Sequence, residues 1–444
     1  MSSQIHLDET LVRREEDLVS FLAEGFKPSD RWVIGTEHEK FGWWIDRGTP
    51  PDYFDPRGIG AVLDGFTQYG WVPSVENGTV VALSRAGATI TLEPGGQLEL
   101  SGAPLRSLLE TERELDDHLR QLAAISEPLG LSWSGLGLMP WGEPHEMPRM
   151  PKPRYDILEK QLNSAGKLGI HMMRQTATVQ ANYDFSDEAD AMKKWRAALC
   201  LQPVITAIFA ASPIVNGQLT DFQSYRGHVW LDTDDARCKV PDSLLGPSPT
   251  LQAYVAWTLD VPMLFLHRDN RYQDCRGRTF RTFMRDGFSG HRANVGDYAL
   301  HLSTIFPDVR LKQFLEVRGA DMGSRAYTLA LPAIHAGILY DEQALAQTLD
   351  LFKALTPQGW RTLRQDVPRR GYGAAIDGFE IGELADEVLR LACEGLNRWE
   401  PGATHLLEPL LAEVSERRCP ADRMRESYTG QPGEVLAQTR LMDL

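Results

Sequence analysis

The sequence lacks long apolar runs: none of its 444 residues belongs to a stretch approaching the roughly 18 apolar residues of a membrane-spanning helix. Its first residues, MSSQIHLDETLVRREEDL, have neither the basic segment nor the apolar core of a secretory signal. The five cysteines show neither CxxC nor zinc-ligand spacing. These absences argue against a membrane or secreted protein, and we expect a cytoplasmic protein with reduced thiols.

Positive charge is also scarce. The chain has 46 Lys and Arg against 61 Asp and Glu, a net charge of −15, which argues against nucleic acid or an anionic membrane as a partner. Neither GxxxxGK[ST] nor GxGxxG after a strand is present, so a nucleotide would have to bind without a glycine-rich phosphate loop. No shift in composition marks a boundary, and we expect one domain over residues 1–444.

Four segments have the apolar spacing of helices: 8–26, 107–126, a segment that follows Ser186, and 381–397. Ser186 is the expected N-cap of the third helix, and Pro203 is expected to kink or end that helix.

Other segments alternate polar and apolar residues, as strands with one buried face do. In GTEHEKFGWW, residues 35–44, Glu37 and Glu39 point to the same face. Two carboxylates roughly 7 Å apart repel by about 2 kcal/mol at an effective dielectric constant near 20, so water or a cation must compensate. His38 and Lys40 take the opposite face, where we expect a core histidine and a lysine that pairs with a carboxylate. The further alternating segments are 88–102, 176–185, 225–232 and 310–321.

A solvated outer face is the simplest explanation of any one of these strands. The set favours another interpretation, because the carboxylates concentrate on some segments, the cations on another, and Trp230 and Phe314 stand among them. We therefore expect an α+β fold in which helices cover the apolar side of an antiparallel sheet and the polar side forms a concave site.

The polar faces hold two complementary kinds of side chain. Carboxylates without accompanying cysteines suit Mg²⁺ or Mn²⁺, and neighbouring arginines and lysines suit an anion; a polyphosphate needs both. The carboxylates are Glu37, Glu39, Glu93, Glu99 and Glu316, and the cations are Arg226, Arg310, Lys312 and Arg318.

Several longer segments resemble one family, the plant-type glutamate–cysteine ligases, which are also found in many bacteria. The segments are GTEHEKFGW, LEPGGQLELSGAP, MPKPRYDI, TVQANYDFS, HVWLDTD, LDVPM, TIFPDVRLKQFLEVRGAD and ILYD, in the family's order over residues 33–341. The resemblance implies a glutamine-synthetase-like fold, with about six antiparallel strands that form a funnel and helices outside it. It also implies that ATP and Mg²⁺ convert the γ-carboxylate of L-glutamate into γ-glutamyl phosphate. Attack by the amine of L-cysteine then gives γ-glutamylcysteine, the first step of glutathione synthesis.

The resemblance also assigns roles to single residues. It implies metal ligation by Glu37, Glu39, Glu93, Glu99 and Glu316, and a weaker ligand or nucleotide contact at Gln180. Lys312 and Arg318 would act on the ATP phosphates as catalytic residues. Substrate binding would fall to Arg154, Tyr225, Arg226 and Trp230, with Arg226 holding the α-carboxylate of glutamate.

Two alternatives stay open at this point. Another ATP-dependent carboxylate–amine ligase of the same fold would take a different amine, and a non-catalytic regulator would bind a metal or an amino acid without turnover. The expected partners are small-molecule substrates, and the expected state is a monomer or homodimer.

Overall fold

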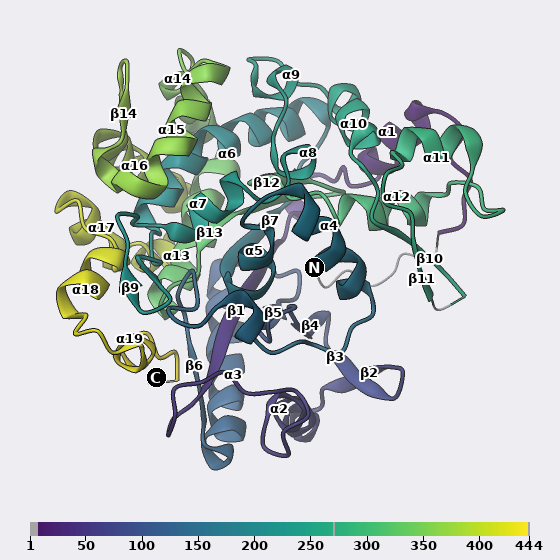
Figure 1. Cartoon of the computed structure of the whole chain (residues 1–444). Coiled ribbons are helices and arrows are strands. Elements are labelled where there is room, and N and C mark those ends of the chain that lie inside the picture. The colour runs from purple at the N-terminus through teal and green to yellow at the C-terminus, as the bar shows by residue number, and fades with distance from the viewer. Residues whose placement is uncertain (1–7, 270, 443–444) are drawn as a thin grey trace.

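The computed structural model describes residues 8–269 and 271–442, and its centre is an antiparallel sheet (Figure 1). The strand order is β12-β13-β7-β1-β5-β4-β3-β2, and β6 pairs with β1 beside this path. The predicted α+β class and antiparallel sheet are confirmed, although the sheet of the described residues has nine strands instead of about six. The strands are β1 (Ile34–Trp44), β2 (Val72–Glu76), β3 (Thr79–Arg85), β4 (Ala88–Leu92), β5 (Leu98–Ser101), β6 (Leu131–Ser134), β7 (Thr178–Tyr183), β12 (Val309–Leu311) and β13 (Leu315–Asp321).

Helices and short hairpins surround this sheet. The hairpins pair β8 (Ile214–Val215) with β9 (Gln218–Leu219), β10 (Phe265–Arg268) with β11 (Arg271–Asp274), and β14 (Ala375–Ile376) with β15 (Phe379–Glu380). The helices are α1 (Glu15–Ala23), α2 (Ile59–Phe66), α3 (Leu108–Ser126), α4 (Arg154–Ala165), α5 (Gly169–Gln175), α6 (Glu188–Ile208), α7 (Tyr225–Leu231), α8 (Asp235–Cys238), α9 (Asp242–Leu245), α10 (Leu251–Asp260), α11 (Phe280–Asp286), α12 (Val295–Leu302), α13 (Arg325–Leu339), α14 (Glu342–Leu351), α15 (Pro357–Arg370), α16 (Ile381–Trp399), α17 (Glu408–Ser415), α18 (Pro420–Ser427) and α19 (Pro432–Gln438).

The two faces of the sheet have different covers. On the apolar face, the Tyr183 hydroxyl donates to the carbonyl of Pro332 in α13, and the His38 ring lies 5.7 Å from His118 in α3. Figure 1 shows α4 and α5 in front of β1 and β7, on the other side. The alternation of the strand sequences therefore separates a hydrophobic core from a polar layer beneath short helices.

The expected helices are present with shifted ends. The segment 8–26 is helical only over α1, and α16 extends to Trp399. Asp187, not Ser186, caps α6, because its carboxylate accepts the backbone N–H of Asp190. Pro203 does not end α6, which continues to Ile208.

Two expected strands differ in kind. Residues 225–232 form helix α7, which begins where the Ser224 hydroxyl oxygen accepts the backbone N–H of Gly227. Residues 310–321 form a hairpin of β12 and β13, in which Arg310 lies opposite Glu316. The turn at Pro94-Gly95-Gly96 is confirmed: it joins β4 to β5, and Gly96 adopts φ 89°, which favours glycine.

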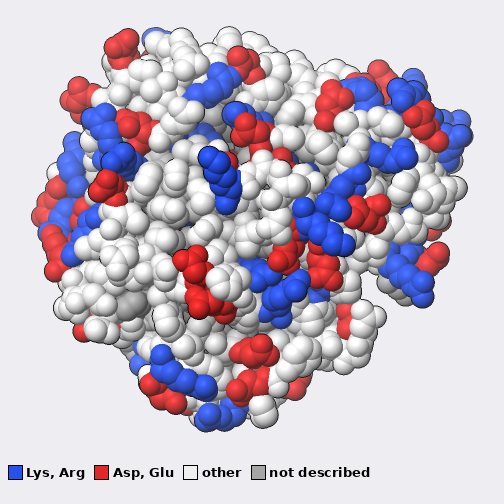
Figure 2. All heavy atoms as spheres, in the orientation of Figure 1, with Lys and Arg blue, Asp and Glu red and all other residues white. Residues whose placement is uncertain are grey.

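The described residues contain no helix with the length and apolar character needed to traverse a bilayer. On the face shown in Figure 2, Lys and Arg side chains are interspersed with Asp and Glu.

Candidate active site

A wall of carboxylates lines the polar face of the sheet. The antiparallel register pairs Glu39 with Glu99 and Glu37 with Gln180. Residues directly opposite each other in a ladder share a face, so these side chains meet. Glu99 is fully buried and Glu39 is 8% exposed. The face is therefore enclosed by the helices above it and is not the solvated surface that a single strand would suggest.

The carboxylates of this wall repel one another. Burial and then the neighbouring Glu93 and Glu99 raise the pKa of Glu39 well above its ordinary value. Burial, Glu316 and Glu99 likewise raise the pKa of Glu37. Within the described residues, neither Glu37 nor Glu39 forms an ion pair with a Lys or Arg. The electrostatic cost that the sequence predicted for this strand is thus present in the folded protein.

Hydrogen bonds orient these glutamates without neutralising them. The backbone N–H of Thr178 donates to Glu39 Oε2 at 3.1 Å, and Asn182 Nδ2 donates to Glu37 Oε1 at 3.1 Å. The hydroxyl of Ser101 donates to Glu99 Oε1 at 2.7 Å. These hydrogen bonds fix the positions of the three carboxylates.

Two buried amide oxygens lie on the same face. Gln180 Oε1 and Asn182 Oδ1 have no hydrogen-bond partner among the described residues. A buried oxygen without a donor is costly unless a ligand supplies one or a cation coordinates it. Carboxylate and amide oxygens are the donors that Mg²⁺ accepts, so the chemistry of this set fits such an ion.

Glu316 differs from the other four glutamates of the predicted metal set. Its carboxylate contacts Arg310 Nε at 2.6 Å, Arg318 Nη1 at 2.9 Å and Lys312 Nζ at 3.3 Å. Although burial opposes it, these cations hold the pKa of Glu316 well below its ordinary range. Glu316 is therefore set apart from the other four glutamates of the expected metal site, because its carboxylate forms ion pairs with three cations. Over residues 8–269 and 271–442, no three Asp, Glu, His or Cys side chains already have the arrangement of a metal site.

A cavity joins the carboxylate wall to the cations. It brings together six of the residues expected in the site, from strands, a turn and a helix. They are Glu39, Glu93, Gln180, Arg226, Trp230 and Arg318. The other six expected residues do not line it: Glu37, Glu99, Glu316, Arg154, Tyr225 and Lys312. Arg154 lies against the Tyr155 ring at 5.4 Å, and Lys312 contacts Glu316.

The helical geometry of α7 determines which of its side chains line this cavity. Arg226 and Trp230 are four residues apart, share a helix face, and lie 5.8 Å from guanidinium carbon to ring. Tyr225 packs instead against Phe222 and His228, at 5.5 and 5.3 Å between ring centroids. The expected substrate contact of Tyr225 is not supported by this geometry, because its ring packs against these side chains outside the cavity.

The sequence analysis missed several residues of the cavity wall. Thr176 and Thr178 stand on the polar face of the same alternating segment as Gln180, and that alternation was a sufficient signal for them. Met172 and Met173 of α5 also line the cavity. Nothing in their local sequence separates them from ordinary core methionines.

On the opposite face of β1, the expectation for His38 is confirmed and that for Lys40 is wrong. Both side chains are buried. Lys40 Nζ lies 2.6 Å from His38 Nδ1 and donates to the His38 carbonyl at 2.9 Å. These contacts make the His38 imidazole and carbonyl, and not a carboxylate, the partners of Lys40 among the described residues. Burial lowers the pKa of Lys40 to about 7.

An antiparallel sheet with an enclosed wall of glutamates beside arginines is the architecture of a carboxylate-activating ligase. Comparison with known proteins narrows this class. Residues 33–440 match Glutamate-cysteine ligase family 2 (GCS2), and the chain belongs to this family.

Curated relatives cover most of the chain. The chloroplastic glutamate–cysteine ligase of Brassica juncea is 40% identical over 423 residues, which are 94% of this chain and 82% of that protein. The corresponding enzyme of Medicago truncatula is 41% identical over 421 residues, with the same two coverages. The predicted cytoplasmic location is contradicted, because these relatives are chloroplastic proteins.

Solved structures support the fold. The crystal structure of Francisella tularensis glutamate–cysteine ligase in complex with AMP has a TM-score of 0.58 at 14% identity, covering 92% of this chain and 88% of that chain. A bifunctional glutathione synthetase from Pasteurella multocida has a TM-score of 0.51 at 14% identity, covering 96% and 52%. At this identity the likeness shows the fold alone.

Proposed function

We propose that this protein joins the γ-carboxylate of L-glutamate to the amine of L-cysteine at the expense of ATP, giving γ-glutamylcysteine for glutathione synthesis. The observation that carries the proposal is the single cavity lined by Glu39, Glu93 and Gln180 on one side and by Arg226 and Arg318 on the other. Family membership supports it, and the AMP-bound relative supports a nucleotide as co-substrate. The whole chain would act as one catalytic domain.

Mg²⁺, or Mn²⁺ in its place, would be held by the carboxylate wall. The holding residues would be Glu37, Glu39, Glu93 and Glu99, with Gln180 offering its unpartnered amide oxygen. A divalent cation held there would offset the negative charge of the ATP phosphates. Its presence would also remove the mutual repulsion that raises the pKa of Glu37 and Glu39.

The cations on the other side would act on the phosphates. Arg318 and Lys312 would stabilise the γ-phosphoryl group while a glutamate γ-carboxylate oxygen attacks phosphorus and ADP leaves. Glu316 contacts both cations and holds them beside the cavity. In this proposal Glu316 positions the catalytic cations and is not a metal ligand.

The amino-acid substrates would lie beside α7. The guanidinium of Arg226 would bind the α-carboxylate of glutamate, and Trp230 would form part of the wall against the amino acids. The cysteine amine would then attack the acyl carbon of γ-glutamyl phosphate, and inorganic phosphate would leave with the bonding electron pair. Positioning and charge stabilisation suffice for both steps, so no nucleophilic side chain is required.

The test is product analysis with purified protein. We expect mass spectrometry to find γ-glutamylcysteine when glutamate, cysteine and Mg-ATP are all present, with one ADP for each product. Omission of any one substrate is the control. A panel of amines and acids scored by ADP release separates the remaining alternative, since a different obligatory amine would identify another ligase of the same fold. The proposal would be overturned if no pair of amino acids supported ATP turnover.

A further inference from the structure

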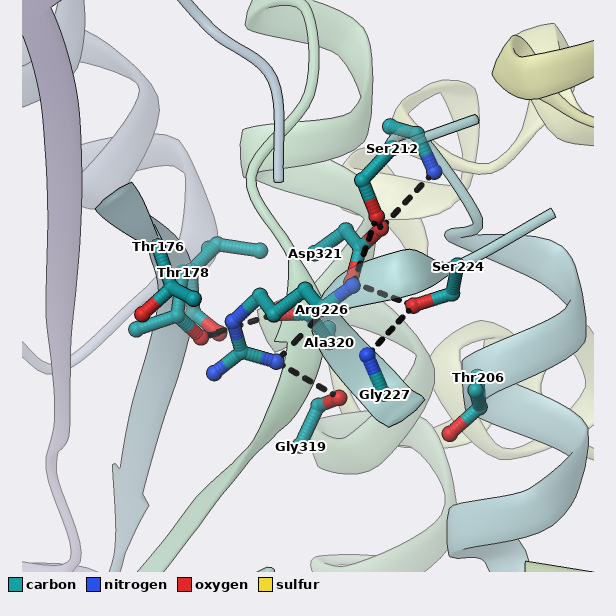
Figure 3. Close-up of polar contacts among 12 residues, drawn as sticks. Thr176, Thr178, Thr206, Ser212, Ser224, Arg226, Gly227, Gly319, Ala320 and Asp321 are labelled. Atoms are coloured by element: carbon teal, nitrogen blue, oxygen red, sulfur yellow. Dashed lines mark hydrogen bonds and ion pairs between the residues drawn. The ribbon is translucent and has the colours of Figure 1, made fainter. Parts of the chain in front are cut away.

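Asp321, the last residue of β13, lies at the centre of a buried hydrogen-bond network behind Arg226 (Figure 3). Its side chain is buried. Oδ2 accepts the backbone N–H of Ala211 at 2.9 Å and the hydroxyl of Ser212 at 2.6 Å. Oδ1 accepts the hydroxyl of Ser224 at 2.8 Å. One carboxylate thus receives three protein donors from two segments that are remote from β13 in sequence.

Ser212 and Ser224 connect Asp321 to the first turn of α7 by hydrogen bonds. Ser212 Oγ accepts the backbone N–H of Arg226 at 3.1 Å, and Ser224 Oγ accepts that of Gly227 at 2.9 Å. A hydroxyl that donates to a carboxylate has a fixed direction, so its lone pairs are aimed at these amides. Asp321 therefore sets the position of the backbone from which the Arg226 side chain extends.

A β-bulge next to Asp321 holds the other end of Arg226. The pairing of β13 with β7 shifts register between Val317 and Ala320. Nη1 of Arg226 donates to the Gly319 carbonyl and Nη2 to the Arg318 carbonyl, each at 3.1 Å. An added Cβ at position 319 would lie 1.8 Å from Gln202 Nε2, so a side chain there would require the buried Gln202 side chain to move.

The guanidinium is aimed into the cavity. Figure 3 shows it pointing toward Thr176 and Thr178, two residues that line the cavity, and away from Ser224. Its Nε is buried and has no hydrogen-bond partner among the described residues. Burial lowers the pKa of Arg226, and Asp321 is the strongest opposing influence, ahead of Glu39. The Asp321 carboxylate lies 3.9 Å from Arg226 Nη1.

We propose that Asp321 is a positioning residue: through Ser212, Ser224 and the bulge at Arg318 and Gly319, it fixes Arg226 for the α-carboxylate of glutamate. This inference rests on the proposed function for its substrate, and it adds a residue that touches neither substrate nor metal. Asp321 holds the first turn of α7 in place, and its negative charge compensates the buried guanidinium of Arg226.

The decisive variant is Asp321→Asn, which keeps the size of the side chain and removes its charge and one acceptor. We expect the KM for glutamate to rise about ten-fold, the factor that one lost charged contact gives, with kcat and the KM for ATP changed by less than about three-fold. Arg226→Lys should raise the same KM, and the double variant should be no worse than Arg226→Lys alone, because the two residues act through one contact.

Asp297→Asn is the matched control. Asp297 is also buried and forms a bidentate ion pair with Arg268 at 2.6 and 2.6 Å, away from the cavity. Its loss should lower thermal stability and leave the KM for glutamate unchanged. If Asp321→Asn does not fold, Ser212→Ala keeps the charge and breaks one link, and it should raise the KM for glutamate about three-fold.

Hydrogen exchange separates this inference from the proposed function. Asp321→Asn should speed exchange of the Arg226 and Gly227 amides, whether or not the wild type is a ligase. If Asp321→Asn loses that protection and the wild type is inactive, the inference that Asp321 anchors α7 would hold and the proposed function would be overturned. If the wild type is active, three results would each overturn the role of Asp321. Asp321→Asn could leave amide exchange unchanged, it could alter every kinetic constant equally, or its effect could add to that of Arg226→Lys.

Discussion

Glu39 and Glu316 lie on the same polar face of the sheet and are both buried. The side chains around them have opposite charge. Glu39 faces other carboxylates, and its pKa is raised. Glu316 faces Arg310, Lys312 and Arg318, and its pKa is depressed. Folding thus leaves Glu39 facing like charges at one end of the site and surrounds Glu316 with cations at the other.

The difference separates binding groups from supporting groups. A buried charge that already has its partners contributes to the fold and to the placement of those partners. A buried carboxylate that faces like charges is stabilised when it takes up a proton or when a cation binds beside it. In the proposed function, the glutamates that face like charges would hold the metal, and Glu316 would orient the phosphate-binding cations.

The same substitution at both positions tests this division, and the largest effect should come from Glu316→Gln. It leaves Arg310, which is 2% exposed, without its carboxylate. Breaking a buried ion pair from one side costs about 3–5 kcal/mol of unfolding free energy, which urea denaturation measures. A variant as stable as the wild type would show that the network does not support the fold.

Glu39→Gln should have the opposite profile. The amide oxygen can still accept the N–H of Thr178, and one repulsive charge is gone, so stability should not fall. Loss of one preorganised electrostatic group should lower kcat by about 10²–10³, as ADP release at several Mg²⁺ concentrations would show. Wild-type turnover with an unchanged Mg²⁺ requirement would contradict the metal assignment.

The other side of the sheet supplies a pH test. His335 of α13 is buried, and burial lowers its pKa to about 4. Because the unfolded chain takes up this proton near pH 6.5 and the folded chain only near pH 4, stability should fall by about 3 kcal/mol as pH drops through that window.

His335→Leu should remove this part of the acid sensitivity and leave turnover near neutral pH within about two-fold. Urea denaturation at pH 4.5 and 7 gives the comparison. An unchanged pH slope would assign the acid sensitivity to other groups, and a large loss of turnover would show that the two faces are not separate.

The smallest expected effect is at the support of Glu37. Asn182→Ala removes the Nδ2 donor to Glu37 and should raise the half-saturating Mg²⁺ concentration about ten-fold, with kcat at saturating Mg²⁺ near that of the wild type. Gln252→Ala is the control, because it deletes a similar side-chain amide contact, to the half-buried Glu15 outside the cavity. Equal Mg²⁺ dependence in both variants would remove Asn182 from the site.

Local periodicity made much of this site predictable. Alternation in residues 35–44 and 176–185 predicted that Glu37, Glu39 and Gln180 share a face, and the register confirms it. Periodicity failed at residues 225–232, because an alternating segment there forms helix α7, which Ser224 caps. Arg226 and Trp230 remained neighbours because a spacing of four places residues together on a helix as well as on a strand.

The sequence by itself determined the α+β class, the antiparallel strands and the inventory of glutamates and arginines, because strand alternation is a property of consecutive residues. Only the tertiary structure decided which glutamates are neutralised, and that Asp321 anchors the backbone of Arg226. Those outcomes depend on contacts between segments a hundred or more residues apart, as between Asp321 and Ser212, where burial makes each pairing strong and no local pattern records it.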